Sequence, residues 1–402
     1  MTRPTDVRVL GALAPYHRGF CAELAALGYA PLSASNLVGL MAHLSRWLRR
    51  HRLHPHELTP DRIAQFLHAR RRRGYTCWLS ERGLRPLLDY LRRLQIVPLS
   101  HPPVADTPVD HFLDRYGVHL LRERGLALST VRPRQQVARR FLAPFVASER
   151  LEFDRLTSGD VTQFIMHECR HSSIGSAKLL VTALRSLLRF LHMEGHTATS
   201  LAAAAPAIAG WRGSALPQAL DSVQVRRLLE SCDRRTAVGR RDFALLLLLV
   251  RLGLRAGEVA ALQLGDVDWR SGEILIRGKG RHDERLPLPP DVGAALAAYL
   301  RRGRPRSASR VVFLRDRAPH DALSRGAITV RVAAACARAG IARVGAHRLR
   351  YTAATQMLQR GSSLAEVAQV LRHRSLTTTA IYAKVDRRAL RALAQPWPGG
   401  RA

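Results

Sequence analysis

The sequence predicts a mainly α-helical chain with one small antiparallel β-sheet, an α+β fold. Apolar residues recur at i, i+3 and i+4 through most of the 402 residues, which is the spacing of amphipathic helices. The segment GEILIRGKGRHDERLPLP at 272–289 differs, because it indicates two short strands around a Gly-rich turn. Hydrophobic residues make up 47% of the chain, so it can fold, and its length suits two or three domains.

Two composition breaks divide the chain, at 101–106 and at 202–217, and small residues, Gly and Pro dominate the second. We therefore expect an additional N-terminal helical domain at 1–101, a second helical domain at 106–201, a linker at 202–216, a C-terminal domain at 217–395 and a tail at 396–402. In the C-terminal domain we expect helices at 223–232, 242–252, 258–264, 290–300, 327–339, 347–360, 364–371 and 377–384, and one further strand at 311–314.

The two N-terminal segments resemble each other in matched blocks at nearly equal offsets. The pairs are LTPDRIAQFL with LTSGDVTQFI, at 58–67 and 156–165, and LRPLLDYL with LRSLLRFL, at 84–91 and 184–191. We expect Thr59 and Thr157 to cap helices, with Pro60 at the first helical position. We interpret residues 1–101 as a duplicate of the second unit, although any two basic helical bundles share such patterns.

The charge predicts a polyanionic partner along the whole molecule. The net charge is +33, with 64 basic and 31 acidic residues, and both halves of the chain are basic. The five cysteines have no metal-ligand spacing, so neither a zinc site nor a disulfide framework is expected. No apolar signal core begins the chain, and its longest apolar run, 244–250, is too short to span a membrane. We expect a cytoplasmic bacterial protein associated with the nucleoid.

Four motifs in the C-terminal domain hold candidate catalytic residues. Each alone is weak, because an arginine on a helix is usually a solvated charge and a lone tyrosine is usually core. Their ordered occurrence is unlikely by chance. The motifs are GLRAGEVAAL at 253–262 with Arg255 and Glu258, GKG at 278–280 with Lys279, HRLR at 347–350 with His347 and Arg350, and LRHRSLTTTAIY at 371–382 with His373 and Tyr382.

With these motifs, residues 216–386 resemble the catalytic domain of the tyrosine recombinases, the phage-integrase family that includes the Xer-type resolvases. Residues 106–205 resemble, less specifically, its helical SAM-like core-binding domain. The resemblance implies a site-specific recombinase of integrase or transposase type from a mobile element. It implies a 3′-phosphotyrosyl intermediate, a Holliday junction, and no metal or nucleotide cofactor. The implied assembly is a homo-tetramer, with or without related recombinases, on double-stranded DNA with inverted-repeat sites. A helix at 386–394 would dock on a neighbouring subunit.

The residue types suit attack on a phosphodiester. Planar guanidinium groups can neutralise the two non-bridging oxygens, which fits Arg255 and Arg350. Glu258 would orient Arg255. Tyr382 would be the nucleophile, His347 its base or proton relay, and His373 a further donor to the phosphate.

Lys279 is the predicted general acid for the leaving 5′-oxygen. Arginine does not release its proton at neutral pH, whereas the pKa of a lysine in an electropositive site can fall. The chain has only three lysines, Lys178, Lys279 and Lys384, among its 64 basic residues. A lysine at this position therefore argues against a random surface charge.

Two residues depart from the family pattern. Arg372 stands where the family usually has Gly, and Tyr351 stands where it commonly has His. Neither position supplies a core catalytic group. Two interpretations of Arg372 stay open, an added phosphate contact and a change in the local turn.

Further arginines and one lysine are candidate DNA contacts, and each is more typical of a sequence-independent phosphate contact or a solvated charge than of a base-reading residue. In the second helical unit and the C-terminal domain they are Arg132, Arg134, Arg139, Arg140, Lys178, Arg281, Arg301, Arg302, Arg304 and Arg306. In the N-terminal unit, ARRRRGYTCW at 69–78 mixes arginines with aromatic residues, so it predicts either nucleic-acid contact or a basic solvated loop. Its arginines are Arg70, Arg71, Arg72 and Arg73.

Three rival functions remain at this point. A type IB topoisomerase resembles the same constellation, although the two-domain plan disfavours it. A catalytically inactive DNA-binding protein of the same fold is disfavoured by the intact residue set. A metal-dependent nuclease could use Asp266 and Asp268, although GDVDW more simply indicates a turn before the hairpin.

Overall fold

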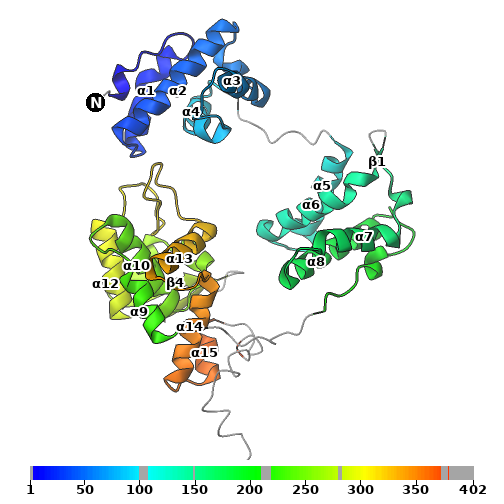
Figure 1. Ribbon diagram of the computed structural model, residues 1–402, viewed down its shortest axis with the longest axis vertical. Helices are drawn as coiled ribbons and strands as arrows, with labels where there is room; N and C mark the ends of the chain where they lie inside the picture. The colour runs from blue at the N-terminus through cyan, green and yellow to red at the C-terminus, as the bar shows by residue number, and fades with distance from the viewer. Residues whose placement is uncertain are drawn as a thin grey trace, which may run out of the picture. The chain divides into compact units, whose positions relative to one another are not determined.

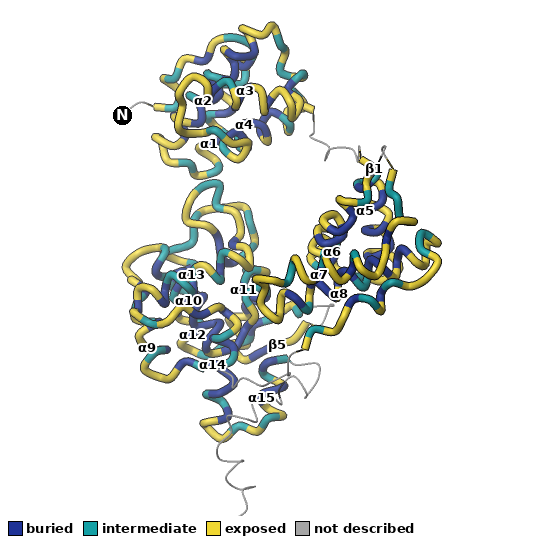
Figure 2. Tube along the Cα trace, turned by 45° about the vertical axis from the view of Figure 1, so that its right-hand side comes forward, coloured by how far each residue is buried: buried dark blue, intermediate teal, exposed yellow. Residues whose placement is uncertain are grey.

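The computed structural model describes residues 3–98, 107–147, 150–209, 219–278, 283–372 and 379. Within them the protein is mainly helical with a small antiparallel sheet, as predicted (Figure 1). By backbone contacts the chain divides into two compact units, Leu99–Ser214 and the remainder, Met1–Pro98 with Ala215–Ala402. Three large apolar cores share no residues, and Figure 2 shows that buried positions line the inner faces of the helices around each core.

The first core joins four α-helices and is built around Leu37, Phe66 and Leu88. Thr59 caps the third helix as predicted, because its side chain accepts a hydrogen bond from the amide of Arg62. The helices are α1 (His17–Ala26), α2 (Pro31–Arg50), α3 (Pro60–Arg72) and α4 (Glu81–Arg93).

The second core also joins four α-helices, and Phe112, Tyr116 and Phe141 fill its centre. Thr157 caps the third of them as predicted, in a reciprocal box with Asp160. The helices are α5 (Pro108–Val118), α6 (Leu128–Leu142), α7 (Ser158–Cys169) and α8 (Ile174–Met193), with a two-residue hairpin of β1 (Val146–Ala147) and β2 (Arg150–Leu151). The matched order of helices and caps is consistent with the duplication, which stays a prediction.

The third core surrounds α10, whose run from Ala244 to Val250 is buried on all sides. Its helices are α9 (Ser222–Glu230), α10 (Ala237–Arg251), α11 (Ala256–Ala261), α12 (Pro290–Arg302), α13 (Arg325–Ala339), α14 (Ala346–Gln359) and α15 (Leu364–Val370). Its antiparallel sheet has the order β3 (Val267–Asp268), β4 (Glu273–Arg277) and β5 (Asp283–Pro287), with Ile274 opposite Leu286.

Two local predictions in this domain were wrong, and a third was incomplete. Residues 311–314 form no strand; Val311 and Leu314 make only isolated bridges, to Gln263 and Ala322. The segment GDVDW leads into the predicted turn, but Val267 and Asp268 within it also form the short strand β3. The helix predicted at 258–264 begins earlier, at Ala256, because Arg255 is an extended N-cap residue, and it ends at Ala261. No helix among the described residues is long and apolar enough to cross a membrane.

Candidate active site

Arg255 is presented by a turn that requires glycine. After α10, Gly253 adopts a φ of +59°, in the left-handed region. A Cβ on Gly253 would lie 2.5 Å from a methyl carbon of Leu371, so the close approach of these two segments also excludes a side chain. Arg255 then begins α11 as its N-cap residue, and its side chain is 46% exposed. The guanidinium group is therefore accessible at the start of a helix.

The carboxylate of Glu258 is buried between two arginines. Its Oε1 accepts a 2.6 Å hydrogen bond from Nη1 of Arg255, and its Oε2 accepts a 2.8 Å bond from the Arg255 backbone amide. Nη2 of Arg372 donates to the same Oε2 at 2.8 Å. Burial acts to raise the pKa of Glu258, but the charge of Arg372 and the hydrogen bonds from Arg255 outweigh it and lower that pKa. Glu258 is therefore held as a carboxylate.

Arg350 lies on α14, and its side chain is almost fully buried. Its Nη1 donates a 2.6 Å hydrogen bond to the carbonyl oxygen of Gly253, and its Nη2 donates to the carbonyl oxygen of Leu371. Gly253 lies two residues before Arg255, and Leu371 lies directly before Arg372. Arg350 thus joins the same two chain segments that Glu258 joins.

His347 lies one turn before Arg350 on α14, and it is exposed. Its ring centroid is 4.6 Å from that of Tyr351, the second departure from the family pattern. Partial desolvation of the ring lowers the pKa of His347, and the positive charges of Arg350 and Arg255 lower it further. Both effects disfavour the charged form, so the imidazole is mainly neutral at pH 7.

A cavity of about 610 Å³ brings these residues together. Arg255, Glu258 and His347 line it, and so does Gly278, the residue directly before Lys279. Two further arginines that the sequence did not single out also line it, Arg277 and Arg325. Arg325 is exposed at the first position of α13. The only sequence signal for Arg277 was its place beside the GKG motif, and for Arg325 there was none.

Several predicted residues and segments lie outside the residues that the structure describes. They are Lys279, Arg281, His373 and Tyr382, the helix expected at 377–384 apart from Thr379, the helix expected at 386–394, the tail at 396–402, and residues 210–216 of the linker.

Both aspartates considered for a metal-dependent nuclease have other partners. Asp266 is buried, and its carboxylate binds Arg277 through contacts of 2.6 and 2.9 Å. Asp268 accepts hydrogen bonds from the amides of Arg270 and Ser271 in the turn after β3. Across the described part of the chain, no group of three or more His, Cys, Asp or Glu side chains is placed to hold a metal ion.

The predicted DNA contacts of the second helical unit differ in their surroundings. Arg139 pairs with Asp110 and Arg140 pairs with Glu168, yet each arginine keeps about half of its side chain exposed, 55% and 52%. Arg134 donates to the hydroxyl of Ser186 at 3.2 Å, and Arg132 is exposed. Lys178 begins the second turn of α8.

The basic segments of the other two units also divide into exposed and packed arginines. Arg301, Arg302 and Arg306 are exposed near the end of α12, whereas the Arg304 guanidinium binds the carbonyl oxygens of Ser309, Val311 and Val312.

In the 69–78 segment, Arg72 and Arg73 are exposed. Arg71 donates to the carbonyl oxygen of Leu79 at 2.8 Å. Arg70 is buried, with its guanidinium carbon 4.3 Å from the ring centroid of Tyr75. Arg70 therefore packs the loop, and the prediction that it contacts DNA does not fit its burial.

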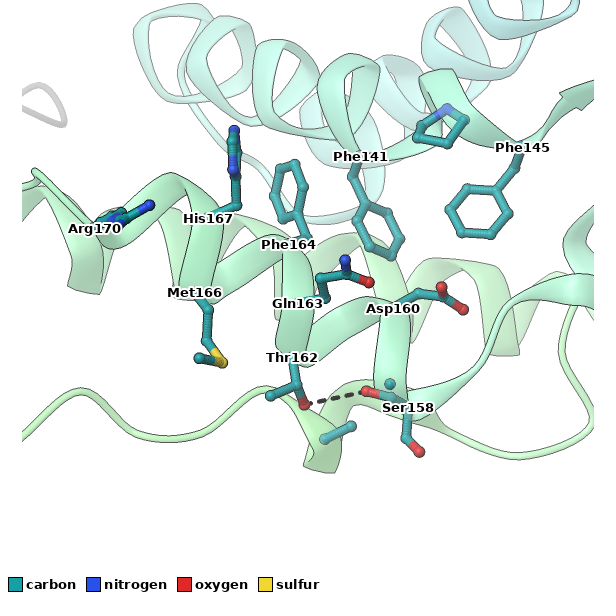
Figure 3. Close-up of a pocket in the computed structure, with 13 residues that line it drawn as sticks. Phe141, Phe145, Ser158, Asp160, Thr162, Gln163, Phe164, Met166, His167 and Arg170 are labelled. Atoms are coloured by element: carbon teal, nitrogen blue, oxygen red, sulfur yellow. Dashed lines mark hydrogen bonds between the residues drawn. The ribbon is translucent and has the colours of Figure 1, made fainter.

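A second cavity, of about 1330 Å³, lies within the second helical unit, and none of the predicted catalytic residues lines it. Figure 3 shows Phe141 and Phe145 beside α7, which carries Phe164 and the other labelled residues from Ser158 to His167. The hydrogen bond from Thr162 to the Ser158 carbonyl oxygen belongs to that helix and not to a site. Of the predicted catalytic residues that the structure describes, Arg255 and His347 line the cavity of the C-terminal domain, and Arg350 does not.

Comparison with known proteins identifies the family. Residues 218–388 match the model of the phage integrase family. The chain is 38% identical to the putative integrase/recombinase y4rA of Sinorhizobium fredii, over 99% of this chain and 97% of the relative. It is 33% identical to the tyrosine recombinase XerD of Mycobacterium tuberculosis, over 71% of this chain and 96% of that protein.

Two solved structures share the fold. One is the XerH site-specific recombinase bound to a palindromic difH substrate in a post-cleavage complex. It has a TM-score of 0.55 and 22% identity, over 73% of this chain and 98% of that one. The other is a lambda integrase tetramer bound to a Holliday junction, with a TM-score of 0.54 and 16% identity, over 74% and 86%. With a relative of this identity along nearly its whole length, the chain belongs to the phage integrase family of tyrosine recombinases.

Proposed function

We propose that this recombinase cuts DNA by attack of Tyr382 on a backbone phosphate. The observation that carries the proposal is the cavity at which Arg255, Glu258 and His347 meet, although their motifs lie far apart in the sequence. The phenol oxygen would form a 3′-phosphotyrosyl bond, and the bond to the 5′-oxygen would break. Because the new ester conserves the energy of the phosphodiester, rejoining needs no ATP.

Each proton transfer has a proposed partner. Neutral His347 would accept the phenol proton directly or through a relay, which its lowered pKa allows at neutral pH. Lys279 would donate a proton to the leaving 5′-oxygen, which becomes a free 5′-hydroxyl. Its neighbour Gly278 lines the cavity that holds Arg255 and His347, which supports this role.

The guanidinium groups would supply the charge that attack on an anion requires. Arg255 is half-exposed and lines the cavity, so it can meet a phosphate oxygen while Glu258 holds its other edge. Arg350, which binds the carbonyl oxygens of Gly253 and Leu371, would supply the second guanidinium group for the phosphate. His373 would add one more donor. With this positive charge in place, we propose that catalysis needs no metal ion.

For the assembly, we propose a homo-tetramer on double-stranded DNA with inverted-repeat sites. DNA-bound structures of the same fold support it, because XerH is bound to a palindromic substrate and lambda integrase to a Holliday junction as a tetramer. The chain would have three domains with the boundaries predicted above. Exposed arginines such as Arg132 and Arg301 would contact DNA phosphates. We place the protein in the bacterial cytoplasm at the nucleoid, where its substrate lies.

Nicked cognate DNA should trap the intermediate. In EDTA, the wild type should form a covalent protein–DNA adduct, and Tyr382→Phe should form none because it lacks the attacking oxygen. Tyr29→Phe, which removes a hydroxyl from the N-terminal helical unit, is the matched control and should keep the adduct. An adduct that persists in Tyr382→Phe would refute the nucleophile, and activity lost in EDTA would favour a metal-dependent nuclease.

The pH dependence of cleavage should report His347. Because its pKa lies below the ordinary value of 6.5, the neutral base persists as pH falls, and the rate should decline only below that value. His347→Gln should slow single-turnover cleavage by about 100-fold or more and remove this acid-side decline. An acid-side decline that is unchanged in His347→Gln would show that another group is the base.

Arg325 should contribute to DNA affinity rather than to cleavage. Arg325→Ala should weaken binding and reduce the slope of log K against log salt by about one, as expected for one lost phosphate contact. Arg338→Ala, at the other end of the same helix and away from the cavity, should leave the slope unchanged. Equal slopes for wild type and Arg325→Ala would remove Arg325 from the interface.

A further inference from the structure

Arg372 occupies a backbone position that an arginine adopts only at a cost. It follows α15 with a φ of +55°, in the left-handed region, where a Cβ is disfavoured and glycine is not. Its side chain is nevertheless ordered against the protein, with 5% of its surface exposed. Contacts of the guanidinium group must therefore compensate for both the backbone and the desolvation.

The guanidinium of Arg372 has two described partners. Nη1 donates to the carbonyl oxygen of Val370 at 2.9 Å, which closes the turn after α15. Nη2 donates to Oε2 of Glu258 at 2.8 Å, where the glutamate side chain is 6% exposed. Because both charges are almost out of water, their interaction is screened far less than a surface ion pair. The contact with Glu258 is the stronger of the two.

The charge balance gives this contact a consequence at the cavity. Glu258 and Arg255 alone would form a pair with no net charge. Such a pair would attract an incoming anion only weakly. With Arg372 on the same carboxylate oxygen as the Arg255 amide, the group of three carries a net positive charge. Arg255 is then fixed in position and remains attractive to a phosphate.

We propose that Arg372 is a positioning residue for DNA cleavage, which acts by holding Glu258 so that Glu258 orients Arg255 toward the scissile phosphate. This inference rests on the proposed function of Arg255. It resolves the two interpretations that the sequence left open: the side chain faces a carboxylate rather than solvent, and the turn keeps the left-handed backbone that glycine adopts freely.

The test compares Arg372→Gly, Arg372→Lys, Glu258→Gln and the double variant Arg372→Gly/Glu258→Gln in the full-length protein. DNA affinity, single-turnover adduct formation at saturating nicked DNA, and thermal unfolding are measured for each. Arg52→Gly is the matched control, since Arg52 is an exposed arginine with a φ of +56° in the N-terminal helical unit. It should change neither affinity nor rate.

In Arg372→Gly, we expect DNA affinity within about twofold of wild type, because many other phosphate contacts dominate binding. Adduct formation should be slowed by about tenfold, less than the about 100-fold cost of deleting a direct donor. The pKa of Glu258 should rise when Arg372 is absent, so the rate should begin to fall at a higher pH than in wild type. This shift of the acid-side fall in rate should vanish in the double variant, because glutamine does not titrate. The double variant should also be no slower than Glu258→Gln alone. Arg372→Lys, which keeps the charge, should retain most of the rate and the wild-type acid side.

Three results would overturn the proposal. The first is a wild-type rate of adduct formation in folded Arg372→Gly. The second is an equal fold-reduction of that rate by Arg372→Gly with and without the Glu258→Gln substitution. The third is a rate reduction matched by a loss of DNA affinity, which would indicate a phosphate contact. If Arg372→Gly does not fold, Arg372→Asn replaces it in the cycle with the same criterion of additivity, because asparagine removes the charge and tolerates a left-handed backbone. If the wild type forms no adduct, the proposed function fails. Thermal unfolding of the two single variants and the double variant still tests the contact between Arg372 and Glu258. Additive destabilisation would refute this contact, and non-additive destabilisation would support it.

Discussion

One buried carboxylate, that of Glu258, connects the chain segments on which the candidate active site depends. Burying a carboxylate is costly, and here hydrogen bonds from Arg255 and Arg372 compensate. Losing one partner of such a buried pair typically costs about 3–5 kcal/mol, so the arrangement resists rearrangement. It fixes the start of α11 against the turn after α15. The position of Arg255 is therefore set by a residue more than a hundred positions away in the sequence.

The same two segments are joined again by Arg350, through the carbonyl oxygens of Gly253 and Leu371, and by the close packing of those two residues. Apart from these contacts, α14 and α15 share a small apolar cluster of their own, with Leu358, Val367 and Leu371. The polar links therefore carry much of the attachment of the α15 turn to the main core. Arg350 and Glu258 serve the architecture of the site as well as its proposed chemistry.

Local patterns predicted much of this fold, because the helices follow from apolar spacing and the caps from Thr59 and Thr157 beside their own helices. They did not predict which arginines are buried. Arg241 is among the largest fully buried side chains and binds Asp242 and Asp316, and the latter lies on a distant loop. The partner of Arg372 is likewise remote. In a chain with 64 basic residues, a buried arginine looks like a solvated one until its long-range partner is known. The site residues with sequence signals were those in compact motifs, whereas Arg325 had none.

The most direct measurement is a structure of the covalent complex trapped on nicked cognate DNA. We expect a phosphate bonded to Tyr382, with a non-bridging oxygen hydrogen-bonded to Arg255 while Glu258 remains between Arg255 and Arg372. We also expect His347 within hydrogen-bonding reach of the tyrosyl oxygen or of a water bound to it. A phosphate held away from Arg255, or a Glu258 detached from Arg372 in the trapped complex, would contradict the proposed site.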